Sequence, residues 1–133
     1  MLVLTGAKLF DGERFHEDSA LLIEGARISA IVPHKQRPRG AETRDLGGGW
    51  LAPGFVDVQV NGGGGALLND KPSLEVVRRI AESHRRFGTT GMLPTLVTDA
   101  PEAMAAGIAA VRTAVGNVAG VLGIHLELSL IHI

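Results

Sequence analysis

Residues 51–65, LAPGFVDVQVNGGGG, contain the short apolar-rich run GFVDVQVN at 54–61, which predicts a buried strand that a glycine tract ends. Side chains alternate between the two faces of a strand, so the valines at positions 56, 58 and 60 are expected on one face. The other face would carry the polar residues Asp57, Gln59 and Asn61. An apolar face against helices and a polar face turned inward are typical of a parallel barrel that opens into a site at its strand ends.

Beyond this strand, the chain alternates helices with strands. Residues 73–86 predict a helix, because Ser73 is a suitable N-cap and apolar residues recur every three or four positions. Residues 91–97 (GMLPTLV) predict a second strand, although its proline is unfavourable inside a sheet. A second helix is expected to begin after a cap at Thr98 or Asp99 and to run to about residue 115, and residues 121–127 (VLGIHLE) predict a third strand. This alternation predicts an α/β fold with parallel strands and right-handed crossovers.

The part of the chain before residue 50 predicts short β-strands. Residues 1–4 and 8–10 form two of them, and residues 20–23 and 27–32 form a hairpin around a glycine-containing turn. The polar stretch 33–45 contains two prolines and several charges, which predicts an exposed loop. The composition changes near residues 51–53, and we place a domain boundary there.

The composition argues against several classes of protein. The chain has 133 residues, 45% of them hydrophobic, and a net charge of −1. So small a charge argues against a nucleic-acid partner or a polybasic membrane contact. The chain contains no cysteine, which excludes a disulfide framework and a thiolate zinc site. Its sequence has neither a signal-peptide core nor an apolar run long enough to span a bilayer, so we expect a cytoplasmic protein.

Two residues of the third predicted strand lie on a candidate site face. Alternation places His125 and Glu127 opposite the apolar residues 124 and 126, with Glu127 at the carboxyl end of the strand. A carboxylate there can ligate a metal, act as a base or pair with a basic side chain. A structural ion pair for Glu127 and a satisfied core histidine at 125 are the simpler alternatives. Gln59 and Asn61 can likewise serve only to hydrogen-bond loop backbone where their strand ends.

The glycine tract at 62–65 follows a strand and precedes a helix, a position where backbone N–H groups can face an anion. Gly62 and Gly63 are therefore candidate site-lining residues, together with Asp57 and His125. The tract is not the G-x-G-x-x-G fingerprint, and no Gly-Lys-Ser/Thr follows it as in a P-loop. A tight connection between a strand and a helix explains it at least as well.

Three co-linear motifs carry a resemblance to a known family. LAPGFVDVQVNGGGG (51–65) resembles the barrel-entry motif of the amidohydrolase superfamily, in which most members end the first strand with a His-x-His pair. Here Gln59 and Asn61 replace that pair, which is similar to the N-acetylglucosamine-6-phosphate deacetylases of the proteobacterial type. HRRFGTTGMLPTLVTD (84–99) and VLGIHLE (121–127) are similar to the same family, in the same order and spacing.

The resemblance implies a fold and an activity. The fold is an incomplete (β/α)8 barrel, with residues 53–127 as its first βαβαβ portion, preceded by residues 1–52 as the N-terminal part of a small β-sandwich domain. The reaction is the removal of acetate from N-acetylglucosamine 6-phosphate, a sugar phosphate substrate, by a homodimer. Glu127 matches the family's metal-ligand glutamate, and Gln59 and Asn61 match the positions of a second metal. Because amides are poorer ligands than imidazole or carboxylate, one divalent ion per subunit is expected, namely zinc.

The chain departs from the family pattern in two ways. The catalytic aspartate, two further histidine ligands and the phosphate-binding residues all lie beyond residue 133 in that pattern, so no catalytic residue is expected here and the chain alone should be inactive. A complete barrel also needs about 250 residues. Residues 128–133 (LSLIHI) replace the family's Gly-Pro and match the translation of a transposon-end adapter, which predicts a non-native tail. A divergent native C-terminus is the alternative.

Three other functions are alternatives to this one. Another amidohydrolase, such as a cyclic amidase, would normally keep His-x-His, which Gln59 and Asn61 replace. A non-catalytic barrel relative could act as an interaction protein, although the retained Glu127 argues against it. A small doubly wound anion-binding module would need a phosphate fingerprint that the sequence lacks.

Overall fold

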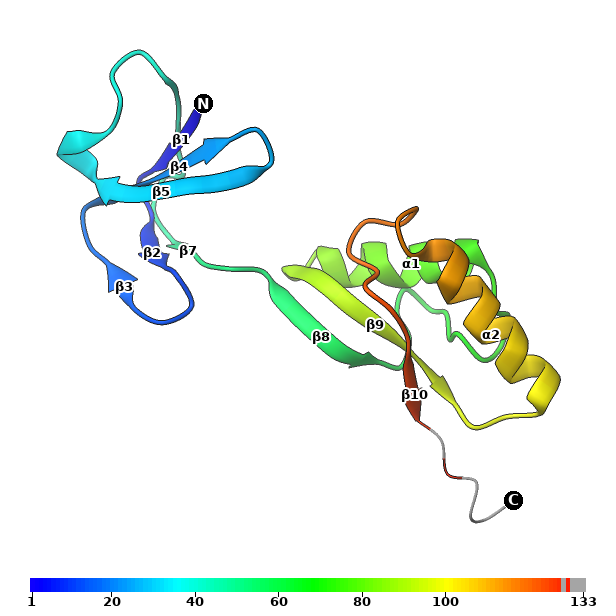
Figure 1. Ribbon diagram of the computed structural model, residues 1–133. Helices are drawn as coiled ribbons and strands as arrows, with labels where there is room; N and C mark the ends of the chain where they lie inside the picture. Colours follow the sequence, from blue (N-terminus) through cyan, green and yellow to red (C-terminus); the bar gives the residue numbers. More distant parts are fainter. Residues whose placement is uncertain (128, 130–133) are drawn as a thin grey trace. The chain divides into compact units, whose positions relative to one another are not determined.

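The computed structural model describes residues 1–127 and 129. The non-native tail predicted at 128–133 therefore lies outside the described residues, apart from Ser129. The chain divides into two compact units, Met1–Pro53 and Gly54–Ile133 (Figure 1).

The first unit contains a four-stranded sheet in the order β5-β4-β1-β6. Its strands are β1 (Leu2–Thr5), β4 (Ser19–Glu24), β5 (Arg27–Pro33) and β6 (Glu42–Asp45). The predicted hairpin is confirmed: β4 pairs antiparallel with β5, and Gly25 at the turn has a φ of 58°, which a glycine adopts without strain. Val3, Ala20 and Leu22 form the buried core of this sheet.

A smaller sheet in the same unit has the order β3-β2-β7, with β2 (Lys8–Phe10), β3 (Phe15–His16) and β7 (Trp50–Leu51). Phe15 of the edge strand β3 has its ring centroid 4.8 Å from that of Phe10 and 5.3 Å from that of Trp50. Aromatic pairs at these spacings stabilise the fold by more than the burial of their apolar surface alone.

The prediction of a loop over residues 33–45 is wrong at both ends of that range. Pro33 ends β5, a short 3-10 helix η1 (His34–Gln36) follows, and the last four residues form β6. All four residues of β6 are exposed, and the strand pairs parallel with β1 from Leu2↔Glu42 to Thr5↔Asp45. The sequence of β6 is polar and lacks apolar alternation, so it gives no signal for a strand. The strand forms because its backbone hydrogen bonds to β1 hold it in place.

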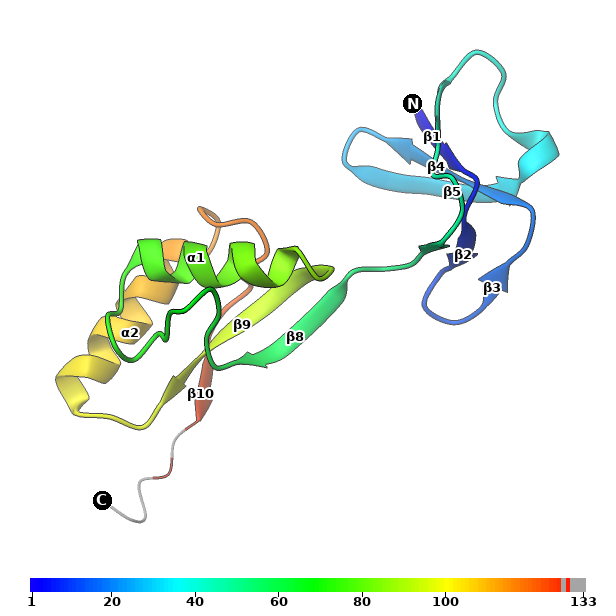
Figure 2. The same ribbon diagram turned by 180° about the vertical axis from the view of Figure 1, so that it is seen from behind.

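The second unit is a three-stranded sheet in the order β10-β9-β8, and its pairs are all parallel, as predicted. The strands are β8 (Phe55–Val60), β9 (Thr89–Val97) and β10 (His125–Glu127). The helices α1 (Leu74–Arg85) and α2 (Pro101–Ala114) lie on one face of this sheet, as Figures 1 and 2 show from opposite sides. No helix in the described part of the chain covers the other face.

The core of the second unit lies between the helices and the sheet. It is built by buried residues of β9, the helices and the loops around them, including Met92, Leu96, Ile80 and Val111. Burial of each such side chain stabilises the fold by roughly 1.5–3 kcal/mol. The third strand is shorter than predicted, because residues 121–124 make only an isolated bridge, Met92↔Val121, before β10 begins.

Pro94 lies inside the central strand β9, where proline is unfavourable because it has no N–H to donate. The register between β8 and β9 shifts between Asp57 and Val60, and Val60 is the residue that pairs with Pro94. This irregularity in β8 opposes the position where the ladder lacks a donor, and so the strand accommodates the proline.

The two helices begin differently. Ser73 caps α1 as predicted, with its Oγ accepting from Val76 N over 3.2 Å. The predicted cap of α2 at Thr98 or Asp99 is wrong: the N-cap is Ala100, which offers no side-chain acceptor, and Pro101 occupies the first turn. Asp99 instead accepts a hydrogen bond from Ala100 N, one residue before the helix. None of the helices in the described part of the chain is long and apolar enough to span a membrane.

Candidate functional site

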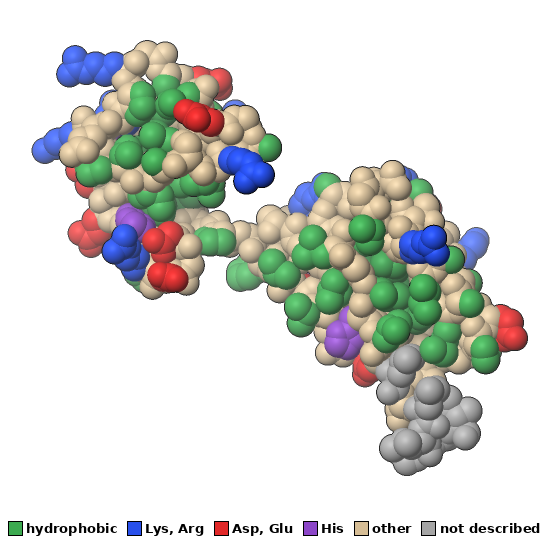
Figure 3. Space-filling view, viewed as in Figure 1, with side chains coloured by type: hydrophobic (Ala, Val, Ile, Leu, Met, Phe, Trp, Pro, Cys, Tyr) green, Lys and Arg blue, Asp and Glu red, His purple; other side chains and the backbone are tan. Residues whose placement is uncertain are grey.

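The candidate site lies on the uncovered face of the β10-β9-β8 sheet, toward the carboxyl ends of its strands. The space-filling view of Figure 3 shows hydrophobic side chains over the second unit on the side that Figure 1 presents. Val56, Val58 and Leu122 are large apolar side chains that are 58–62% exposed. Polar side chains from β8 and β10 are found beside this apolar surface.

Gln59 and Glu127 are joined directly. The side-chain Nε2 of Gln59 donates to Oε2 of Glu127 over 3.0 Å. Gln59 lies on β8 and Glu127 on β10, with β9 between them in the sheet, so this bond reaches across the central strand. The structure therefore brings together two sequence-predicted residues that lie 68 positions apart in the chain.

His125 makes a second bond across β9. Its Nδ1 lies 2.8 Å from the carbonyl oxygen of Val58 on β8. Because a carbonyl oxygen only accepts, Nδ1 must donate and carries the proton in this geometry. In the neutral ring Nε2 then keeps a free lone pair, which can accept a hydrogen bond or bind a metal.

Thr95 lies in the central strand between these two bonds. It pairs in register with His125 and is 1% exposed. Its Oγ1 is buried without a hydrogen-bond partner among the described residues. A buried hydroxyl with no partner costs about 1–3 kcal/mol. Sequence reasoning missed this residue, because a threonine inside a strand is an ordinary β-former.

The backbone of Glu127 is fixed at the end of β10 by Thr98. The backbone N and the Oγ1 of Thr98 both donate to the carbonyl oxygen of Glu127, each over 3.2 Å. The same Oγ1 accepts from Ser129 N over 2.8 Å. The main chain of Glu127 is therefore held while its carboxylate stays exposed and engaged by Gln59.

Asn69 organises the carboxyl end of β9 and was not predicted from the sequence. Its Oδ1 accepts from Val97 N over 3.1 Å, and its Nδ2 donates to Val97 O over 2.9 Å and to Asp99 Oδ2 over 3.2 Å. The pKa of Asp99 is lowered mainly by the hydrogen bond from Ala100 N and, to a smaller extent, by the one from Asn69. An asparagine in a loop gives no signal for a contact 28 residues away.

The strict alternation predicted for residues 54–61 is wrong. The register shift in β8 interrupts it, so Val56 and Val58 are exposed and only Val60, 2% exposed, joins the helix-facing core. Asp57 pairs with the core residue Met92, and its Oδ1 accepts from Gln59 N over 3.1 Å. Asp57 therefore contacts the backbone of Gln59, while the side chain of Gln59 binds Glu127.

Asn61 follows the last residue of β8 and is exposed. Its side chain makes no hydrogen bond within the described residues. Of the pair that replaces His-x-His, only Gln59 is thus engaged in the structure.

The glycine tract folds into a tight turn that is closed between Gly63 and Ala66. Gly63 N donates to Ala66 O over 2.9 Å, and Ala66 N donates back to Gly63 O over 3.1 Å. A side chain at Gly63 would lie 2.4 Å from Ser83 Oγ, so only glycine allows α1 to approach this closely. His84 of α1 contacts the tract through its Nε2, 2.8 Å from Gly62 O. The tract therefore packs the loop against α1.

The described residues do not fit a complete zinc centre. They contain no group of three or more His, Cys, Asp and Glu side chains that could hold a metal ion. A catalytic zinc normally has three protein ligands. Glu127 supplies one carboxylate, and Gln59 occupies one of its oxygens.

Several of the known proteins that this chain matches are amino-sugar 6-phosphate deacetylases. Residues 1–51 match the family model of the NagA composite domain. The N-acetylgalactosamine-6-phosphate deacetylase of Shewanella sp. (strain ANA-3) is 40% identical over 133 residues, covering 96% of this chain and 33% of the relative. The N-acetylglucosamine-6-phosphate deacetylase of Haemophilus influenzae is 34% identical over 111 residues, covering 83% of this chain and 29% of the relative.

Solved structures give the same result. The N-acetylglucosamine-6-phosphate deacetylase of Pasteurella multocida superposes with a TM-score of 0.86 at 31% identity, covering 97% of this chain and 35% of the other. The enzyme of Mycobacterium smegmatis gives a TM-score of 0.79 at 27% identity, covering 96% and 35%. The chain spans about a third of the length of the relatives it matches.

Proposed function

We propose, from the relationship of this chain to the N-terminal third of the N-acetylglucosamine-6-phosphate deacetylases, that it belongs to an enzyme that hydrolyses the acetamide of an N-acetylamino-sugar 6-phosphate. The single observation that carries the proposal within the site is the bond between Gln59 and Glu127 at the carboxyl ends of parallel strands. In α/β folds this edge of the sheet is where ligands bind.

The sheet of the second unit is the beginning of a (β/α)8 barrel in this proposal. Its strands are parallel, its helices cover one face, and its edge strands β8 and β10 offer positions for pairing with further strands. The β-sheets of the first unit are part of the small β-sandwich domain. The uncovered face, with Gln59, Thr95 and Glu127, would then face the barrel interior.

Glu127 is proposed as the one metal ligand that this chain contributes, with zinc as the ion and a single ion per subunit. Its carboxylate is exposed and its backbone is fixed by Thr98, so the side chain is available while its origin is held. Gln59 and Asn61 are neutral amides, which favours one ion over two. The remaining ligands and the base that moves the proton must come from residues outside this chain.

The identity of the sugar is the finer part of the proposal. N-Acetylglucosamine 6-phosphate is the proposed substrate, and the galactosamine epimer is the alternative, because relatives named for each sugar match this chain. The proposed enzyme is a cytoplasmic homodimer.

The test is a chimera in which residues 1–127 of this chain replace the matching segment of the Shewanella relative. The chimera should release acetate from an N-acetylamino-sugar 6-phosphate, and comparing the two epimers identifies the sugar. A folded chimera that turns over neither epimer, beside an active parent enzyme, would overturn the proposal.

A further inference from the structure

The connection between β5 and β6 concentrates positive charge in a chain whose net charge is −1. Residues 33–40 read PHKQRPRG and contain Lys35, Arg37 and Arg39 with no acidic residue among them. This segment lies in the first unit and plays no part in the candidate site on the second.

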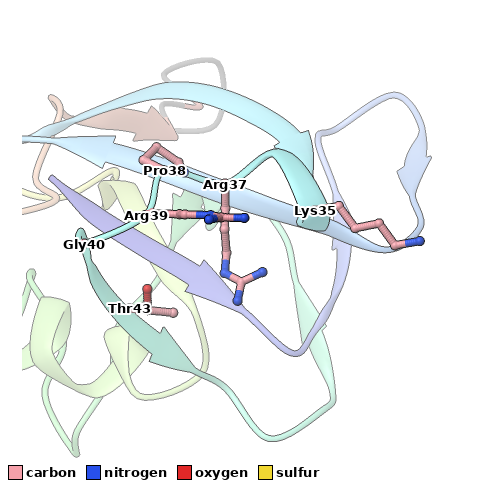
Figure 4. A pocket seen from close by; sticks show the side chains of 6 residues that line it. All are labelled: Lys35, Arg37, Pro38, Arg39, Gly40 and Thr43. Carbon is pink, nitrogen blue, oxygen red and sulfur yellow. The ribbon is translucent and has the colours of Figure 1, made fainter.

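The three cations line one pocket. Its volume is about 390 Å³, and Pro38, Gly40 and Thr43 complete its lining, so no carboxylate is part of its wall. In the view of Figure 4 the side chains of Arg37 and Arg39 overlap, whereas Lys35 extends away from them. Both arginines and the lysine therefore belong to the lining of one pocket.

The cations of this pocket are not neutralised within the described residues. None of the ion pairs among the described residues involves Lys35, Arg37 or Arg39. Those ion pairs are made by Arg14, His16, His34 and Arg78. Like charges that share a concave surface raise the local positive potential and attract anions. The pocket thus carries charge for which the described chain supplies no partner.

The pocket is also partly preorganised. Arg37 Nη1 donates to His34 O over 3.0 Å, and Arg37 N donates to the same oxygen over 3.3 Å. Pro33 and Pro38 restrict the backbone on either side of these bonds. An arginine held in this way loses less conformational entropy when it binds a ligand.

We propose that this pocket binds the phosphate group of a small phosphorylated molecule. A planar guanidinium matches two phosphate oxygens at once, and a dianionic phosphate monoester can engage both arginines while Lys35 adds charge at the rim. The volume matches the range of small-ligand pockets. A single carboxylate carries one charge and should bind more weakly.

The experiment is a titration of the 133-residue chain with inorganic phosphate at constant ionic strength. Backbone amide chemical shifts report the binding. A second titration uses glucose 6-phosphate and a third uses acetate. Amide shifts should concentrate in residues 34–43, with phosphate and the sugar phosphate binding at least about tenfold more tightly than acetate. Tighter binding of the sugar phosphate would identify an organic phosphate as the ligand, and equal affinities would identify the free ion.

Matched variants locate the site. Arg39→Gln should weaken phosphate binding by about tenfold, the loss expected for one charge-assisted contact. Arg39→Lys keeps the charge but removes the planar guanidinium that can bind two phosphate oxygens at once. The affinity of this variant should therefore fall between those of the parent and Arg39→Gln. Arg27→Gln makes the same change of charge at an exposed position of β5 outside the pocket and should leave binding unchanged.

Two results would overturn the proposal. One is a shift pattern that sodium chloride reproduces at the same ionic strength. The other is an equal loss of affinity in Arg27→Gln and Arg39→Gln, which would mean diffuse attraction without a site. Neither result depends on acetate release, so this proposal and the proposed deacetylase activity can fail separately.

Discussion

The side-chain amide of Gln59 donates to the carboxylate of Glu127 across the central strand of the second unit, over 3.0 Å and between residues 68 positions apart in the chain. The amide occupies Oε2 and leaves Oε1 free of this contact. A positive ion or a proton donor that reaches Glu127 must therefore share the carboxylate with Gln59 or displace it.

Glu127 and Asn61 should differ sharply in the chimera. Glu127→Gln keeps the shape of the side chain but removes its charge, and we expect acetate release to fall by more than about 100-fold together with bound zinc. Asn61→Ala should lower activity by about tenfold or less, because an exposed amide tunes a site more than it holds an ion. Elemental analysis and acetate release measure both effects. Unchanged zinc and activity in Glu127→Gln would show that Glu127 is structural.

Thr95→Val should not destabilise the 133-residue chain and is expected to stabilise it. The hydroxyl is buried with no partner among the described residues, so its replacement by a methyl group of similar shape removes an unpaid desolvation cost of about 1 kcal/mol. Thermal unfolding measures the effect.

The matched control for Thr95 is Thr98→Val. It removes a hydroxyl that donates to Glu127 O and accepts from Ser129 N, so it should cost about 1 kcal/mol. A destabilised Thr95→Val variant would mean that its hydroxyl has a partner, such as a bound water.

Asn69→Ala should loosen the carboxyl end of β9. The substitution removes the acceptor for Val97 N and the donor to Val97 O, and we expect the Val97 amide to exchange with solvent about tenfold faster. It also removes a hydrogen bond that lowers the pKa of Asp99, so this pKa should rise toward its usual value. Hydrogen exchange and an NMR titration test both. The amide of Leu22, in the core of the other unit, is the internal reference.

His16→Leu should raise the pKa of Asp11. The hydrogen bond from His16, 2.6 Å from Asp11 Oδ2, is the main reason that this pKa lies well below its usual value of 3.8, and backbone bonds from Arg14 and Glu13 add to it. Because the folded pKa is depressed, the stabilising contribution of Asp11 is present above pH 3.8 and is lost as the pH falls below it.

The variant should therefore lose less stability than the parent chain when the pH is lowered from 4 toward 2, about the range in which Asp11 differs between the folded and unfolded states. The carboxyl carbon resonance of Asp11 gives its pKa directly. An unchanged pKa in His16→Leu would assign the shift to the backbone donors alone.

Features that depend on local sequence patterns were predicted correctly. Predictions failed where the conformation of one strand depends on its neighbour in the sheet. Ser73 was identified as a cap because its contact spans three residues, and the helices and parallel strands followed from periodicity. The faces of Val56 and Val58 were predicted wrongly because the register shift in β8 opposes a proline in β9, which no pattern within β8 reveals. For the same reason Asn69 and Thr95 were missed, since their environments depend on residues distant in the sequence.

The final prediction is that the 133-residue chain releases no acetate from either sugar phosphate, with or without added zinc, under conditions in which the chimera is active. Three protein ligands are needed to hold a catalytic zinc, and no such group is present among the described residues. Glu127 alone, shared with Gln59, offers one carboxylate that competes poorly with water for the ion. The sheet also leaves β8 and β10 as edges, so the face that carries Glu127 cannot exclude solvent from a reacting amide. The assay should include calorimetric titration of zinc. Turnover by the isolated chain, with one zinc bound per molecule, would mean that a complete site exists within it and that the proposed division of ligands is wrong.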